Sequence, residues 1–358
     1  MLLNKYKIND NRDYQSFKKV SISNYKINDL IKLYSNYLIN SKIDFTSNLL
    51  IELHCSGHLQ KIINTFIKIY FQNINIKNPY LFNYLMKKID YLNKLLNNYK
   101  KKDYIHTRND QEIRNLLIYL NGIITNSTKS NILLNKYLPK IKDSDYEETI
   151  IKNNIQSNNF DYLELIDYTH HENNYMKIAC NEIFYLLYYK NNLQKIYFWY
   201  FWAIKHCDND IFYNYLFKII KFKIDTLEKR NKNYILLLIL NFNNKLFNKS
   251  IKQNILFIIF YTFLNNVNFY KNIINKEESV LEMSVKVNCF YQEINNKINP
   301  SYRINNFFEN ENKDNTIEYK NIDKTKNNVK EKKNNIEPVN KLKKREKYKL
   351  DIYNKLFL

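Results

Sequence analysis

The residue types that most often do chemistry occur here in a few small groups. His54, Cys55 and His58 form the densest group, and the two histidines stand four residues apart, one turn of a helix. That spacing places two imidazoles on one side of a helix, but a tetrahedral metal site needs further ligands, and the nearby sequence offers none. We therefore expect these residues to pack at a helix end, with no metal and no cofactor bound.

The remaining histidines and carboxylates give little support for catalysis. Histidines stand beside acidic residues at 170–172 and at 206–208, in segments where capping and surface roles are common. The paired glutamates at 147–148 and at 277–278 are adjacent, so their side chains do not face each other as an acid and a base would. No signature of a nucleophile is present, and we predict that the chain is not an enzyme.

Glycine is scarce, and this restricts the fold. The 358 residues include two glycines, Gly57 and Gly122, and four prolines. Dinucleotide-binding and phosphate-binding loops need glycines close together, where the backbone approaches the phosphates. Helices joined by turns that contain asparagine need few glycines, because asparagine tolerates the left-handed conformation at a helix end.

The distribution of apolar residues predicts helices. From residue 27 to 297, apolar stretches at helical spacing alternate with short polar clusters. The longest apolar runs, at 196–204, 234–240 and 255–264, fall short of the ~18 residues of a membrane span. The aromatic run 197–202 belongs to the first of them; we expect most of its rings to lie in the core, with a base-stacking surface as the alternative.

One sequence pattern occurs twice. Leu-Gln-Lys-Ile begins at Leu59 and again at Leu193, and aromatic-Asn-Tyr-Leu begins at Phe82 and at Tyr213. The copies lie 134 and 131 residues apart, as expected when loops vary in length and helices do not. Helical repeats bury their apolar faces by stacking on one another. We therefore predict an all-α fold, an α-solenoid of roughly six to eight stacked antiparallel helix pairs in residues 27–300.

Each unit resembles a pentatricopeptide repeat, the RNA-binding relative of the tetratricopeptide repeat. The matching residues are Leu49, Leu50, Leu53, Gly57 and Leu59 in the first unit and Ile183, Phe184, Leu187, Asn191 and Leu193 in the second. The two units cover residues 44–90 and 178–221. Where the family has a small residue on its second helix, this chain has Ile62 and Ile196.

The resemblance implies single-stranded RNA binding without catalysis. The base-reading position of the family falls at Asn48 in the first unit and at Glu182 in the second; at the start of the following units it falls at Tyr84 and Tyr215, where stacking is expected. The implied roles are organelle RNA processing, translation or ribosome assembly, within a ribosomal or RNA-processing complex. The alternative is a tetratricopeptide-like scaffold that holds a protein partner in the same groove.

The charge of the chain leaves two explanations open. The formal net charge is +21, and lysine supplies 50 of the 56 basic residues. From residue 309 onward there are 14 basic and nine acidic residues, so most of the excess lies in the body. A positive body favours association with a polyanion such as RNA. The rival explanation is codon composition, since the sequence is also rich in asparagine, isoleucine and tyrosine.

The two ends of the chain differ from the body. Residues 1–26 are a basic, serine-containing extension and a candidate mitochondrial targeting segment, although Asp10 and Asp13 are unusual in one. Nuclear and cytoplasmic locations are the alternatives. Residues 301–358 are predicted to be mostly disordered. They include a basic cluster, with candidate RNA contacts at Lys341, Lys343, Lys344 and Arg345. A solvated tail and a nuclear-type address are the other interpretations of this cluster.

Overall fold

A computed structural model describes residues 6–99, 104–130, 132, 138–139, 151, 153–157, 161–169, 174–265, 267 and 286–298. Throughout these residues the secondary structure is helical, apart from an isolated antiparallel bridge between Val20 and Lys26. The α-helices are α1 (Ile27–Ile39), α2 (Ile43–Cys55), α3 (Leu59–Ile69), α4 (Pro79–Leu96), α5 (Gln111–Asn126), α7 (Asn174–Tyr185), α8 (Leu193–His206), α9 (Asn209–Ile224), α10 (Lys229–Asn241), α11 (Lys249–Asn265) and α13 (Val287–Ile298). The predicted all-α fold class is confirmed for the described part of the chain.

Short helical elements join or extend these helices. The 3-10 helices are η2 (Tyr14–Phe17), η4 (Asn75–Lys77), η5 (Tyr104–Asn109) and η8 (Asp161–Ile166), and the π-helices are η3 (Tyr70–Ile74) and η9 (Leu186–Lys190). Several α-helices begin where the sequence supplies a cap. The carboxylates of Asp110 and Asp208 each accept hydrogen bonds from two backbone N–H groups at the start of α5 and α9. Such caps stabilise a helix by about 1 kcal/mol each.

The repeated sequence pattern corresponds to a repeated structure. In the first copy α2 leads through Gly57 (φ 75°) into α3, and in the second α7 and η9 lead through Asn191 (φ 50°) into α8. Positive φ suits glycine and is tolerated by asparagine, which explains these two residues at the same point of the repeat. In both copies the aromatic-Asn-Tyr-Leu segment lies near the start of the third helix, which is α4 in the first copy and α9 in the second.

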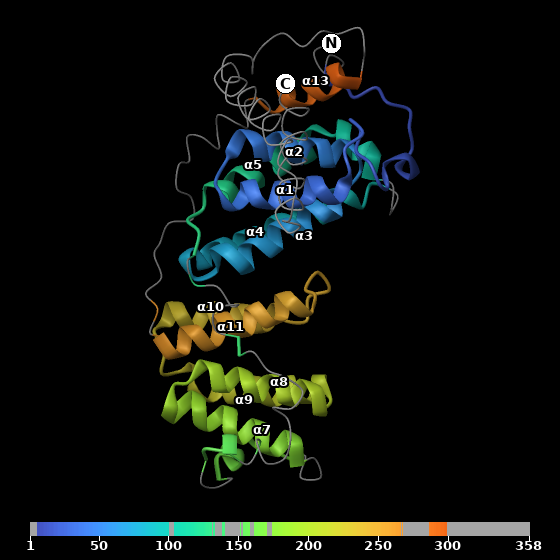
Figure 1. Cartoon of the computed structure of the whole chain (residues 1–358). Coiled ribbons are helices and arrows are strands. Elements are labelled where there is room, and N and C mark those ends of the chain that lie inside the picture. The colour runs from blue at the N-terminus through green and yellow to red at the C-terminus, as the bar shows by residue number, and fades with distance from the viewer. Residues whose placement is uncertain are drawn as a thin grey trace, which may run out of the picture.

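The helices form a layered stack, but not in chain order (Figure 1). Helices α1–α5 form a first group and α7–α9 a second. The α10–α11 pair lies between these two groups, because α10 packs on α4 while α11 packs on η3, η4, α8 and η9. Helix α13 returns to the opposite end of the molecule and packs on α2 and α5. A solenoid whose pairs stack in the order of the sequence is therefore not confirmed. Residues 127–173, between α5 and α7, are long enough to carry the chain past the layer that α10 and α11 occupy.

Aromatic side chains fill much of the core. In the run 197–202, Tyr197, Trp199 and Tyr200 are fully buried and Trp202 is nearly so, whereas Phe198 and Phe201 are half-buried. Core packing thus accounts for most of this run, as expected.

The ends of the chain are described in part. Residues 6–26 lie on the body, with Ile8, Phe17 and Ile22 buried in the core. Residues 299–358, which hold the predicted disordered tail and the basic cluster, lie outside the described residues. None of the described helices is both long enough and apolar enough to cross a membrane.

Candidate nucleic-acid interface

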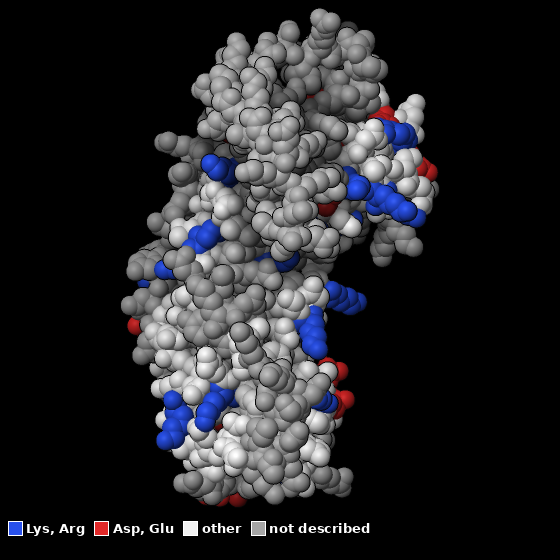
Figure 2. Space-filling model, viewed as in Figure 1, with Lys and Arg blue, Asp and Glu red and all other residues white. Residues whose placement is uncertain are grey.

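A groove of about 750 Å³ lies between the first group of helices and the α10–α11 turn. One wall comes from α1 and α3 and the other from residues 245–251. The space-filling view shows an indentation in the outline between the upper and lower halves of the molecule, with Lys or Arg side chains at its edge (Figure 2). The groove lining combines three lysines with four amide side chains: Lys61, Lys68, Lys245, Gln60, Asn64, Gln72 and Asn248.

Helix α3 positions most of these side chains by its amphipathic sequence. Its apolar residues, among them Ile62, Phe66 and Ile69, are buried against the neighbouring helices. The polar residues Gln60, Asn64, Lys68 and Gln72 recur every fourth position, so they form a stripe along the opposite side. Gln60 Nε2 donates a hydrogen bond to Asn64 Oδ1 at 3.0 Å, which orders two neighbouring amides of the stripe.

The second wall is held in place by a buried phenylalanine in the α10–α11 turn. The ring of Phe247 packs edge-on against Phe71 with centroids 5.4 Å apart, and against Phe82 at 6.4 Å. Asn248 caps α11 by accepting a hydrogen bond from the backbone N–H of Ile251 at 3.0 Å. The apolar anchor and the cap fix the turn, so the exposed Lys245 is presented from a defined backbone.

The groove is electropositive. Among the described residues that line it there is no aspartate or glutamate to neutralise the three lysines. Burial lowers the pKa of Lys61 from its ordinary value, which indicates partial removal of its ammonium group from water. An anionic ligand would restore favourable contacts to such an ammonium group, and low-dielectric walls strengthen the attraction.

The sequence-predicted base reader Glu182 lies elsewhere. It is 1% exposed, and its carboxylate accepts hydrogen bonds from the backbone N–H groups of Gln156 (2.9 Å) and Ser157 (3.0 Å) and from the Ser157 hydroxyl. Both carboxylate oxygens are therefore bound to the chain's own backbone. In this arrangement the carboxylate fastens a loop to α7, and the contact between Glu182 and RNA stays a prediction.

The other predicted contacts do not meet in one place either. Asn48 is buried in α2, Tyr84 is half-buried with its ring 6.5 Å from that of Tyr119, and Tyr215 is buried with its hydroxyl 2.8 Å from Thr169 Oγ1. None of the three residues lines the groove. The basic cluster Lys341, Lys343, Lys344 and Arg345 lies outside the described residues.

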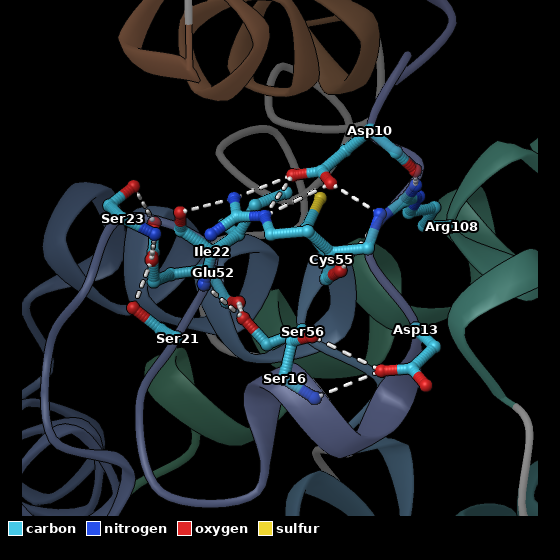
Figure 3. Close-up of polar contacts among 11 residues, drawn as sticks. Asp10, Asp13, Ser16, Ser21, Ile22, Ser23, Glu52, Cys55, Ser56 and Arg108 are labelled. Carbon is cyan, nitrogen blue, oxygen red and sulfur yellow. Dashed lines mark hydrogen bonds and ion pairs between the residues drawn. The ribbon is translucent and has the colours of Figure 1, made fainter.

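Glu52 in the first unit has the same role as Glu182 in the second. It is fully buried and accepts hydrogen bonds from the hydroxyl groups of Ser21 and Ser23 and from the Ser23 backbone N–H, at 2.9 Å for the last (Figure 3). Each glutamate thus fastens the segment that precedes its unit. Aligning the two copies on Leu-Gln-Lys-Ile does not reveal this equivalence, because the two glutamates stand at different distances from that segment.

The N-terminal segment is also held by an ion pair. Arg12 donates to the Asp10 carboxylate, at 2.6 Å for the closest contact, and to the Ile22 carbonyl oxygen at 3.0 Å. Burial raises the pKa of Asp10, but the hydrogen bonds from Arg12 outweigh it and leave this pKa below its ordinary value. Arg108 donates to the Asp10 carbonyl oxygen and links the segment to η5 (Figure 3).

The metal-like group of the sequence consists of structural residues. His54 is fully buried and lies between the Tyr291 hydroxyl (2.5 Å) and Thr107 Oγ1 (3.0 Å), so it joins α13 and η5 to α2. Burial lowers the pKa of His54 to about 3. His58 Nε2 donates to the Phe17 carbonyl oxygen at 2.8 Å and points to a different neighbour. In the described part of the chain no cluster of three or more His, Cys, Asp or Glu side chains could hold a metal ion.

Comparisons with protein-family models, with curated proteins and with solved structures gave no match. The resemblance to the pentatricopeptide repeat therefore depends on the matching residues alone. The groove residues that sequence reasoning missed had one visible signal, the stripe of Gln60, Asn64, Lys68 and Gln72 at every fourth position. Lys245 had none, because its position depends on how the α10–α11 pair packs.

Proposed function

We propose that this chain binds single-stranded RNA, without catalysis, in the groove between α3 and the α10–α11 turn. The observation that carries the proposal is the lining of the groove: three lysines, four amides and, among the described lining residues, no carboxylate. Lysines neutralise backbone phosphates, which supplies most of the affinity for a nucleic acid. The predicted setting in organelle RNA processing, translation or ribosome assembly stays a prediction from the resemblance.

The amides favour unpaired bases as the second half of the ligand. Asparagine and glutamine carry both a donor and an acceptor, so they can bond to the Watson–Crick edges of bases. Those edges are accessible in a single strand and are already paired in a duplex. Two amides, Gln60 and Asn64, and then Lys68 follow one another along one side of α3, which suits an extended strand that offers both base edges and phosphates along its length.

The surroundings of the buried His54 support a non-catalytic role. Both ring nitrogens of His54 lie within hydrogen-bond distance of side chains of the protein itself, and the ring is inaccessible to a substrate. A general base must reach the proton that it takes from a substrate. His54 is placed to join three elements of the fold instead.

The test is a binding measurement with the full chain. Fluorescence anisotropy with a labelled oligouridine of about 20 nucleotides should show binding, and a duplex of the same length should bind more weakly. The variant K61Q/K68Q/K245Q should lose affinity for the single strand by roughly 100-fold at about 0.1 M salt, since three phosphate contacts are removed.

The matched control removes the same amount of positive charge from a part of the surface outside the groove. The variant K87Q/K94Q/K229Q removes three exposed lysines that do not line the groove, and it should lose much less affinity. Equal losses in the two triple variants would refute a defined site and leave only diffuse attraction. Absence of binding at low salt would refute RNA binding altogether and favour a protein partner.

A further inference from the structure

An exposed aromatic surface lies on the second unit, on η8, the end of α7, η9 and α9. We call it the aromatic platform and define it as Tyr162, Tyr185, Tyr188, Tyr189 and Phe222. Tyr189 is 59% exposed and Phe222 is 49% exposed, while the other three rings are half-buried. Single exposed apolar side chains are common on proteins, but a contiguous group of aromatic rings marks an interaction surface.

The rings of the aromatic platform touch one another and rest on the core. The Tyr162 centroid lies 5.7 Å from that of Tyr185 and 5.4 Å from that of Tyr189. Tyr188 lies 5.7 Å from Phe222, and it stacks at 4.3 Å on Phe184, which is fully buried. The Tyr188 hydroxyl donates to the Ile219 carbonyl oxygen at 3.1 Å. These contacts hold the ring planes in place before any ligand arrives, which lowers the entropic cost of binding.

Local backbone structure groups the tyrosines. Residues 186–190 form the π-helix η9, which continues α7 and ends at the left-handed Asn191. Tyr185, Tyr188 and Tyr189 are three and four residues apart, so this segment places them on one side. π-Helical turns are rare and are frequent at functional sites.

Two lysines lie over the aromatic platform. The Lys223 ammonium group is 4.9 Å from the Tyr188 centroid, and that of Lys190 is 6.0 Å from the Tyr185 centroid. Both distances are within the range of cation–π attraction. Four acidic residues lie within three sequence positions of these rings and lysines: Asp161 and Glu164 in η8, Glu182, whose carboxylate accepts from the backbone of residues 156–157, and Asp225, which pairs with Lys232.

We propose that the aromatic platform is a second RNA-binding surface, where unpaired bases stack on Tyr189 and Phe222 while Lys190 and Lys223 contact phosphates. Flat rings beside cations match a nucleotide, whose base has a π face and whose phosphate is anionic. The inference rests on the proposed function, because it assigns a second contact to the same single strand. Stacking tolerates any base, so this surface adds affinity and little sequence preference.

The first test separates stacking from charge. The variant Y189A/F222A should bind the labelled oligouridine at least about 30-fold more weakly than the wild type, since two stacked bases are lost. Its affinity for heparin, a polyanion without bases, should stay unchanged. The variant K61Q/K68Q/K245Q should instead weaken binding to both ligands. Tyr80→Ala, at an exposed ring outside the aromatic platform, is the matched control and should change neither.

The second test uses the wild-type chain, so it does not depend on how a variant folds. An oligouridine that contains 5-iodouridine is photo-crosslinked to the protein and the modified peptides are sequenced. Crosslinks at Tyr185, Tyr189 or Phe222 support the proposal. If the wild type binds RNA but its crosslinks avoid these residues, the aromatic platform is not a binding surface and the groove proposal stands. If the wild type binds no RNA, the proposed function fails and this inference fails with it.

Discussion

Replacing Glu182 with glutamine should destabilise the protein, because this carboxylate fastens residues 156–157 to α7. The carboxylate accepts from two backbone N–H groups, at 2.9 and 3.0 Å, and from a hydroxyl group. Glutamine keeps one acceptor oxygen and turns an NH2 group toward the remaining N–H, so a donor faces a donor. Losing one hydrogen bond to a charged acceptor costs about 1.5–3 kcal/mol.

Urea unfolding followed by circular dichroism measures this cost. A loss of about 2 kcal/mol should lower the midpoint by roughly 0.5–1 M urea. Hydrogen exchange gives a local measure, since the amide protons of Gln156 and Ser157 should exchange faster in the variant. Glu164→Gln is the matched control, because Glu164 is an exposed glutamate on the neighbouring η8; its midpoint should not change.

The result also decides between two roles of Glu182. A base reader would keep its stability on conversion to glutamine and change its preferred RNA sequence, since an acceptor becomes a donor. An unchanged midpoint together with a changed RNA preference would refute the fastening role and restore the prediction made from the family resemblance.

Two further predictions concern stability. Burial lowers the pKa of His54 to about 3, so between about pH 3 and 6.5 the unfolded chain binds more protons than the folded one. For this residue, the free energy of unfolding should therefore decrease by about 1.4 kcal/mol for each unit by which the pH is lowered in this range. His54→Gln should make the urea midpoint less pH-dependent than in the control His106→Gln, and an unaltered pH dependence would contradict the buried, neutral His54. Gly57→Ala should cost about 1–2 kcal/mol, because φ is +75° and a Cβ would lie 2.9 Å from Tyr14 Cδ2. Asn191→Gly, at the equivalent left-handed residue, should cost little or nothing by the same unfolding assay; similar losses in both variants would show that backbone conformation is not the cause.

The helices and their repeat could be predicted from local patterns. Apolar periodicity, the capping aspartates and the turn residues Gly57 and Asn191 all act within a few residues, so the sequence reveals them directly. The order of the layers could not be predicted this way. It depends on contacts between α11 and both η3 and α8, which lie far apart in the sequence.

The sequence did not reveal which residues line the groove. The positive charge of the body favours a polyanion, and the three lysines of the groove supply part of that charge, but the identity of the partner stays a prediction. The contact between Glu182 and RNA stays a prediction, because it carries a repeat family's reading position over to a helix whose glutamate here holds a loop. Position within a repeat predicts exposure only when the surrounding segments pack as they do in the family.

The most direct test of the central claim is the salt dependence of RNA binding by the groove. Each phosphate contact with a single strand contributes about −0.7 to the slope of log affinity against log salt concentration. We predict a slope of roughly −3 to −5 for the wild type, and a slope shallower by about 2 for K61Q/K68Q/K245Q, while K87Q/K94Q/K229Q stays close to the wild type. A slope that is the same in the wild type and in K61Q/K68Q/K245Q would show that Lys61, Lys68 and Lys245 do not contact phosphates, and would contradict the account.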